Sequence, residues 1–179
     1  MGVLFDYFAA ASDDEAAAVV DRVGGPGSQA VLAPQPDPPK RGLFGRRQPT
    51  PAPELTTDPQ LAILDTVADT GIEPTVQLGT LEELLTGRAY DDIAVDPGQV
   101  VASRDAGRCM VVSVSDELVT ALAASSDGRL AEVVVPWSQT EEFWGDADPA
   151  DLHAVLRDLA ALARRAQNEG LRLYCWVSV

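Results

Sequence analysis

The sequence predicts a single α+β domain, in which about five helices pack on a mainly antiparallel or mixed sheet. Hydrophobic residues make up 46% of the 179-residue chain, enough to form one buried core. Short strand-like and helix-like segments follow one another without a regular βαβ unit or an internal repeat. These observations favour helices laid on an antiparallel sheet over a parallel α/β sheet or a solenoid.

Five helices are expected because five segments open with residue types that cap helix N-termini. The expected starts are Ser12, Asp58, Thr80, Ser115 and Asp148. The second of these helices is expected to end near Gly71. The last is the longest, because a leucine-rich stripe at helical spacing reaches about Asn168 before Gly170 stops it.

Seven short segments rich in β-branched and aromatic residues are expected as strands. They cover residues 3–8, 29–32, 75–78, 99–102, 109–114, 130–135 and 171–179. In the last one, alternate residues point to opposite faces, so Tyr174 and Trp176 share the face away from the core. If this strand pairs with residues 130–135, Trp176 lies near Trp137 and Trp144 in an aromatic cleft. Cys109 and Cys175 both fall in expected strands and are interpreted as buried, reduced residues.

The best candidate for a functional site is the segment from Trp137 to Trp144. All three tryptophans of the chain lie in its last 43 residues, and two of them bracket this polar stretch. Polar groups are costly to bury without partners, so the segment is expected at a surface or a cleft. The candidate binding residues are Trp137, Gln139, Glu141, Glu142, Trp144, Tyr174 and Trp176.

Several interpretations of this segment stay open. It is a protein-binding surface, since tryptophan and tyrosine dominate interface hot spots, or a ligand site that uses aromatic stacking. A hydrolase with Glu141, Glu142 and Tyr174 in an aromatic cleft is the alternative, although adjacent carboxylates rarely face each other across a substrate. The structural interpretation is a one-turn helix whose Phe143 and Trp144 plug the core. No catalytic residue is assigned.

Charge narrows the class of partner. The formal net charge of −15 argues against nucleic acid, which needs a basic face. Such a charge usually serves solubility, and the alternative is a basic protein partner approached under electrostatic steering. The leading hypothesis is therefore a non-enzymatic module that binds or inhibits a basic partner. We expect a cytoplasmic protein without a membrane span, because no apolar run approaches the roughly 18 residues required and the N-terminus has no basic signal region. The oligomeric state is left open.

No metal and no cofactor are expected. Asp146, Asp148 and Asp151 lack the glycine and distal glutamate of a calcium loop and are interpreted as helix-capping acids. His153 is the single histidine, and no companion ligands stand at suitable spacing.

Residues 33–54 form a proline-rich segment that differs from the rest of the chain. They contain seven of the 13 prolines and four of the 13 basic residues, with a net charge of +2 that leaves −17 on the remainder. Proline at this density cannot join a helix or a central strand, so a surface loop or linker inserted in the domain is expected. Within it, Leu43 and Phe44 stand between two basic pairs and form a candidate docking site for a partner.

Three stretches together resemble the YfbM-like family of small bacterial proteins. They are the Met-Gly opening with aromatics and an acidic helix (residues 1–20), the run Leu84-Leu85-Thr86-Gly87, and the ending, where a tryptophan-bearing acidic segment precedes a helix and a last strand. The chain departs from that family in its proline-rich insertion and in lacking a tryptophan and a histidine before the Leu-Leu-Thr-Gly run. The resemblance implies an α+β fold, and it brings no established activity and no functional residues.

Overall fold

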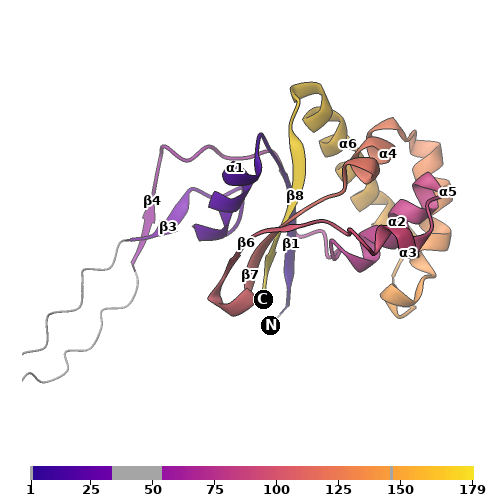
Figure 1. Cartoon of the computed structure of the whole chain (residues 1–179), viewed down its shortest axis with the longest axis horizontal. Coiled ribbons are helices and arrows are strands. Elements are labelled where there is room, and N and C mark those ends of the chain that lie inside the picture. Colours follow the sequence, from indigo (N-terminus) through magenta and orange to yellow (C-terminus); the bar gives the residue numbers. More distant parts are fainter. Residues whose placement is uncertain (1, 34–53, 146) are drawn as a thin grey trace, which may run out of the picture.

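The computed structural model describes residues 2–33, 54–145 and 147–179, and it is built around a five-stranded antiparallel sheet (Figure 1). The strand order is β5-β1-β8-β7-β6, so the first and last strands of the chain pair at the centre. Their bounds are Leu4–Ala10 (β1), Thr66–Val67 (β5), Val100–Arg104 (β6), Cys109–Ser113 (β7) and Arg172–Ser178 (β8). The α+β fold expected from the sequence is confirmed, and every strand pairing is antiparallel.

Six α-helices and three short 3-10 turns are found in the described residues. The helices are Asp13–Ala17 (α1), Val76–Thr86 (α2), Tyr90–Ile93 (α3), Asp116–Ala124 (α4), Asp127–Ser138 (α5) and Pro149–Glu169 (α6). The 3-10 turns are Ala18–Asp21 (η1), Asp105–Gly107 (η2) and Glu141–Phe143 (η3). Four of the expected helix ends are confirmed: Ser12, Ser115 and Asp148 accept hydrogen bonds from the first turns of α1, α4 and α6, and Gly170 ends α6 in a left-handed conformation.

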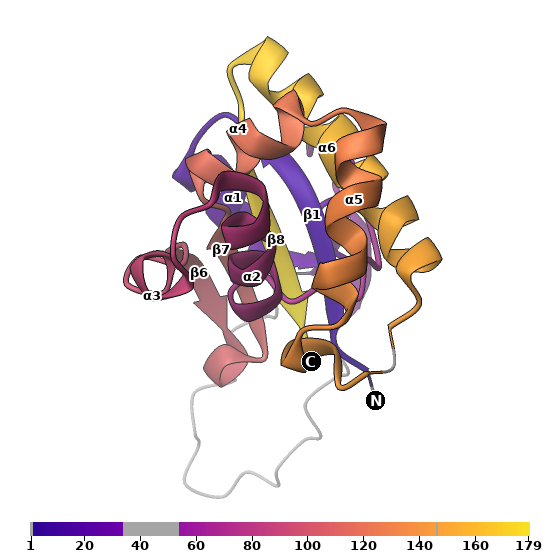
Figure 2. The same cartoon turned by 90° about the vertical axis from the view of Figure 1, so that its right-hand side faces the viewer.

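The two faces of the sheet are covered by different helices (Figure 2). Helices α2, α4, α5 and α6 pack on one face, where the strands contribute residues such as Tyr7, Val112 and Cys175. On the other face, α1 and η1 cover Phe8, Val111 and other residues of alternate register. Both faces of the central strands are therefore buried. Cys109 and Cys175 are free and buried, as expected, and they lie on opposite faces.

A second, three-stranded antiparallel sheet lies beyond α1, away from the large helices (Figure 1). It consists of Arg22–Val23 (β2), Ala30–Leu32 (β3) and Leu55–Thr57 (β4). The N–H of Ala33 donates to the carbonyl of Glu54 at 2.8 Å, so the chain leaves and re-enters this sheet at one place. The proline-rich segment lies outside the described residues, apart from these two end residues.

The expected strand at 130–135 is wrong, because these residues belong to helix α5. Three consecutive valines suggested a strand, yet the buried residues of α5 recur at helical spacing: Leu130, Val133, Val134 and Trp137. The hydroxyl of Ser126 accepts from the N–H of Arg129 at 3.2 Å and caps the first turn. Burial of one helical stripe against α6 thus overrides the β propensity of the valines.

Two further expectations are wrong for reasons of local hydrogen bonding. Residues 75–78 begin helix α2 instead of forming a strand, because the Glu73 carboxylate accepts from the N–H groups of Thr75 and Val76 and caps that helix. The helix expected from Asp58 to Gly71 is replaced by turns and the short strand β5, which pairs with the edge of β1. There the Asp58 side chain accepts from the Gln60 N–H and closes a turn.

Asp6 is a buried carboxyl on the α1 side of β1, and we predict that its charge makes stability depend on pH. One oxygen accepts from the Asp69 N–H at 2.8 Å, and burial raises the pKa of this carboxyl, with the nearby charge of Asp69 acting in the same direction. A raised pKa in the folded state means that the folded chain holds a proton more readily than the unfolded chain. Stability should therefore fall as pH rises through the window between the ordinary value of 3.8 and the raised one.

The Asp6→Asn variant should be more stable than the parent at pH 7, because an amide keeps the accepting oxygen and removes the buried charge. The difference should disappear below the ordinary carboxyl pKa, where the parent is protonated in both states. Urea unfolding at pH 3.5, 5 and 7 measures this, with Asp92→Asn on the exposed surface of α3 as the control. A stability difference that does not change with pH would refute the prediction.

Candidate functional site

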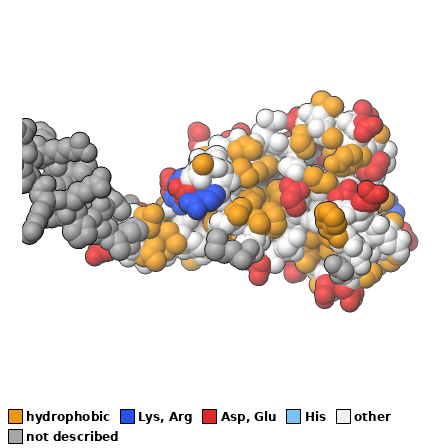
Figure 3. Space-filling model, turned by 90° about the horizontal axis from the view of Figure 1, so that it is seen from below, with side chains coloured by type: hydrophobic (Ala, Val, Ile, Leu, Met, Phe, Trp, Pro, Cys, Tyr) orange, Lys and Arg blue, Asp and Glu red, His pale blue; other side chains and the backbone are white. Residues whose placement is uncertain are grey.

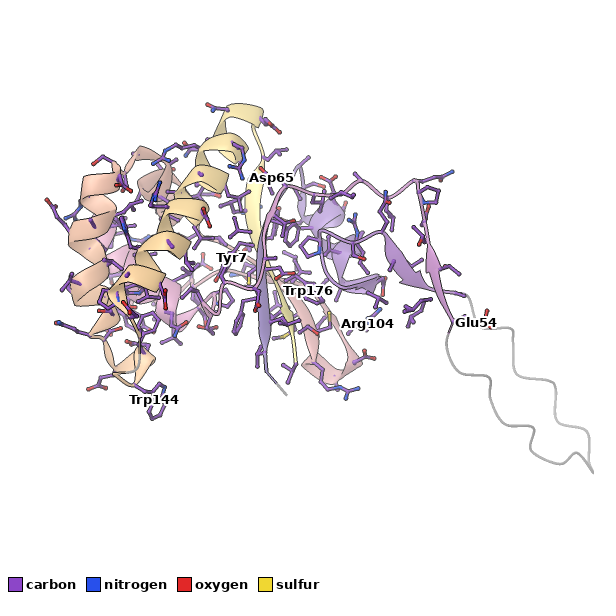
Figure 4. All side chains as sticks on the ribbon, turned by 180° about the vertical axis from the view of Figure 1, so that it is seen from behind. Tyr7, Glu54, Asp65, Arg104, Trp144 and Trp176 are labelled. Carbon is purple, nitrogen blue, oxygen red and sulfur yellow. The ribbon has the colours of Figure 1, made fainter. Side chains whose placement is uncertain are left out.

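Trp144 is the most exposed large hydrophobic residue in the described chain, with 89% of its surface accessible (Figure 4). It follows η3 and adopts φ 56° and ψ 15°, the left-handed region. Bulky residues reach this region at a cost of roughly 1–2 kcal/mol, which is why glycine or asparagine usually stands there. An aromatic residue that is both strained and exposed contributes nothing evident to folding.

The backbone that leads to Trp144 is held in place by short-range hydrogen bonds. At the end of α5, the N–H and the hydroxyl of Thr140 both donate to the carbonyl of Trp137, at 3.1 and 2.9 Å. Phe143 donates to the carbonyl of Thr140, and Trp144 donates to that of Glu141. The segment is therefore a fixed platform that presents the indole to solvent.

Trp137 anchors this platform in the core. Its side chain is fully buried, its ring meets Phe143 edge to face at 5.0 Å, and its indole N–H donates to the carbonyl of Gln77 at 3.0 Å. The Gln77 amide in turn donates to the carbonyl of Glu142 at 3.2 Å. Helix α2 and the segment before Trp144 are thus tied together in both directions.

A shallow hollow of about 610 Å³ lies beside Trp144. It is lined by Gln139, Thr140, Glu141, Glu142, Trp144 and Gly145. Glu141 is exposed, whereas one carboxylate oxygen of half-buried Glu142 is shielded from solvent and has no hydrogen-bond partner among the described residues. The hollow therefore offers an aromatic face and acidic oxygens to a cation.

Exposed apolar residues lead from the ends of the central strands to this hollow. Val3 and Leu4 lie at the start of β1, and Val179 follows β8. The Thr70 hydroxyl donates to the carbonyl of Phe5 in β1, and the chain then leads from Thr70 to Val76 at the start of α2. Val76 is next to Gln77, whose side-chain amide donates to the carbonyl of Glu142 in the lining of the hollow. Figure 3 shows hydrophobic side chains gathered on this side of the molecule, with acidic side chains beside them.

Tyr174 and Trp176 do not belong to this site, and the expected aromatic cleft is wrong. Both are buried on the α1 face of the sheet, whereas Trp137 lies on the opposite face. The Tyr174 hydroxyl donates to Asp13 at 2.8 Å, and burial raises its pKa to about 12. Trp176 pairs with Asp6 at the centre of the sheet. Figure 4 shows it far from Trp144. The hydrolase arrangement with Tyr174 beside the two glutamates is therefore not assembled.

The structural interpretation is right for part of the segment only. Residues 141–143 do form a one-turn helix, and Phe143 packs against the core. The tryptophan that fills the core is Trp137, however, whereas Trp144 is exposed to solvent. Of the expected site residues, the structure thus brings together Gln139, Glu141, Glu142 and Trp144. The docking pair Leu43 and Phe44 lies outside the described residues.

The described residues contain no group of three or more His, Cys, Asp or Glu side chains placed to hold a metal ion. The expected capping role of Asp148 is confirmed by its bond to the Ala150 N–H, and His153 lies 3.4 Å from Asp127. No helix within the described ranges has both the length and the apolar character that a membrane crossing requires.

Val76 contributes to this surface but was not among the residues expected there from the sequence. The β-branched run at 75–78 predicts a strand at Val76, whereas the Glu73 carboxylate two residues before Thr75 caps a helix there. The sequence does hold a signal that Trp137 is buried and Trp144 is not. Apolar residues recur at helical spacing over 130–137, and this spacing places Trp137 on the buried stripe of α5.

Comparisons with protein-family models, with curated proteins and with solved structures found no match for the chain. The resemblance to the YfbM-like family therefore stays a prediction.

Proposed function

We propose that this protein is an interaction module that binds a basic partner, with Trp144 as the central contact. The observation that carries the proposal is the exposed, left-handed Trp144 on a hydrogen-bonded platform. Strain that brings no folding benefit points to a role in recognition. Tryptophan is also the residue type most enriched among interface hot spots.

The charge of the surroundings supports a cationic contact. Glu141 and Glu142 line the hollow beside the indole, and the chain outside residues 33–54 carries a net charge of −17. An arginine or lysine placed over an indole face gains about 0.5–2 kcal/mol, and more when a carboxylate is also within reach. The net negative charge would attract a basic partner and accelerate association at low salt.

The proposal is tested with a defined probe, a decapeptide of alternating arginine and glycine, and the same peptide with citrulline in place of arginine. Citrulline has nearly the same shape and no charge. We expect calorimetric titration of the full chain to show binding of the arginine peptide only, with at least a tenfold loss in Trp144→Ala and a smaller loss in Glu142→Gln.

Two control variants separate this site from general attraction to an acidic surface. Val95→Ala removes another highly exposed apolar side chain, 84% accessible, and Asp92→Asn removes an exposed acid on α3. Both should bind the arginine peptide like the parent. Equal binding by the parent and Trp144→Ala would overturn the proposal.

Trp144→Gly should separate binding from stability. Glycine adopts positive φ without strain, but it also adds freedom to the unfolded chain, which offsets part of the gain. We expect the free energy of unfolding to stay unchanged or to rise by up to about 1 kcal/mol, while peptide binding is lost. Urea unfolding measures the first quantity and calorimetry the second. A clear loss of stability would show that Trp144 supports the fold.

A further inference from the structure

We propose that one partner of the Trp144 surface is a second copy of this chain, bound through its basic segment 40–47. The sequence of that segment is Lys-Arg-Gly-Leu-Phe-Gly-Arg-Arg. It places an apolar pair, Leu43 and Phe44, between two pairs of cations. This inference rests on the proposed function, because it uses the same surface and names the partner.

The first support is charge complementarity within the chain. Of the nine arginines in the described residues, eight already contact a carboxylate or a backbone carbonyl. Arg22 and Arg164 are examples that bind carbonyl groups only. The other four basic residues of the chain all lie in segment 40–47, which is the densest cluster of positive charge in the sequence.

The second support is the match between the segment and the hollow. Trp144 offers an indole face and Val76 an exposed aliphatic side chain, which suit Phe44 and Leu43. Glu141 and Glu142 stand in the same hollow and suit the flanking arginines. An aromatic and acidic surface is therefore matched by an aromatic and basic segment.

The third support is the place where the segment begins and ends. Residues 33 and 54 are hydrogen-bonded to each other, so the 20 residues between them begin and end at one place in the structure. Half of that length spans at most about 35 Å. Glu54 and Trp144 lie on opposite sides of the central sheet, with Trp144 at the edge of the helical layer (Figure 4). This arrangement favours the Trp144 surface of a neighbouring copy over that of the same chain.

A contact of this kind joins two different surfaces, so it is a head-to-tail contact. Each copy would then offer one segment and one hollow. We expect sedimentation velocity to show self-association of the full chain that grows with protein concentration. It should weaken as salt is raised from 20 to about 500 mM, because the contact is largely ionic.

Two variants with opposite defects provide the decisive test. Trp144→Ala removes the receiving surface, and the double variant Leu43→Ser, Phe44→Ser removes the docking pair. Each alone should be monomeric at concentrations where the parent associates. Mixed together, they should form a 1:1 dimer and nothing larger, because the mixture holds one working segment and one working hollow per pair.

Other outcomes overturn the inference in distinguishable ways. If the parent is monomeric and a peptide of residues 36–51 does not bind, while the arginine decapeptide does, the proposed function stands and the second copy is excluded. If the parent is monomeric and the Leu43, Phe44 variant makes Trp144 more quenchable by iodide, the segment binds within its own chain. If neither peptide binds, both proposals fail.

Discussion

Replacing Trp137 by alanine is expected to lower the free energy of unfolding by about 3–5 kcal/mol. The side chain is fully buried in the helix-covered core and meets Phe143 edge to face. Its truncation leaves a large cavity and deprives the carbonyl of Gln77 of its indole donor. Because whole domains are stable by only about 5–15 kcal/mol, this loss is a large part of the total. Urea unfolding followed by circular dichroism measures it.

The matched control is Trp144→Ala, seven residues further along the chain. Its side chain is 89% exposed, so its removal should change stability by less than about 0.5 kcal/mol. Comparable losses in the two variants would contradict the placement of both residues. Where Trp137→Ala does not fold, Trp137→Phe serves instead, because it keeps most of the ring volume and should lose less stability.

Trp137→Ala should also weaken binding of the arginine peptide, although Trp137 does not reach the surface. Phe143 packs on the Trp137 ring, and the indole N–H donates to the carbonyl of Gln77, whose side-chain amide donates to the carbonyl of Glu142. Loss of these contacts frees the platform that holds Trp144. At temperatures where Trp137→Phe is fully folded, its binding should lie between that of the parent and that of Trp144→Ala.

The parts of the fold that the sequence predicted well are those determined by local interactions. Ser12, Ser115 and Asp148 each cap a helix through a side-chain oxygen and an N–H two or three residues ahead. Gly170 ends α6 because glycine adopts a left-handed conformation without strain. Such signals need no knowledge of the rest of the molecule, so they can be read from a few consecutive residues.

Two of the failed expectations, the faces of the last strand and the strand at 130–135, concern long-range packing. Alternation along the last strand, β8, placed Tyr174 and Trp176 on a face away from the core, but α1 and η1 cover that face and bury both residues. Residues 130–135 satisfy two patterns at once, a β-branched run and a helical stripe. The choice of helix depends on the packing of its apolar stripe against α6 and the rest of the core, which a short stretch of sequence does not show.

Four of the seven expected site residues lie at the candidate site, and the other three are buried. Its polar composition indicated a surface, and Gln139, Glu141, Glu142 and Trp144 do lie there. Which of the two bracketing tryptophans is exposed follows from the end of α5 and the left-handed turn at residue 144. No local signal predicts a positive φ at tryptophan, because the residue type itself opposes it.

Gly98→Ala is expected to lower the free energy of unfolding by more than about 3 kcal/mol. Gly98 has φ +106° and precedes β6. A Cβ atom there would stand only 2.2 Å from the carbonyl oxygen of Ser113, which is backbone and cannot rotate away. Gln99 fixes the approach, because its N–H donates to the Ser113 hydroxyl at 2.8 Å and its carbonyl accepts from the Ser113 N–H at 2.9 Å. Relief of the contact would require β6 to separate from β7.

Gly107→Ala is the control that isolates this contact from backbone strain. Gly107 has φ +86°, similarly unfavourable for alanine, and a Cβ atom there would meet nothing within 4 Å. It should therefore lose only the roughly 1–2 kcal/mol of a left-handed residue. Urea unfolding of both variants gives the difference, and hydrogen exchange of the β6 and β7 amides should show faster opening in Gly98→Ala alone. Equal losses in the two variants would mean that strain, and not the close approach to Ser113, requires glycine at position 98.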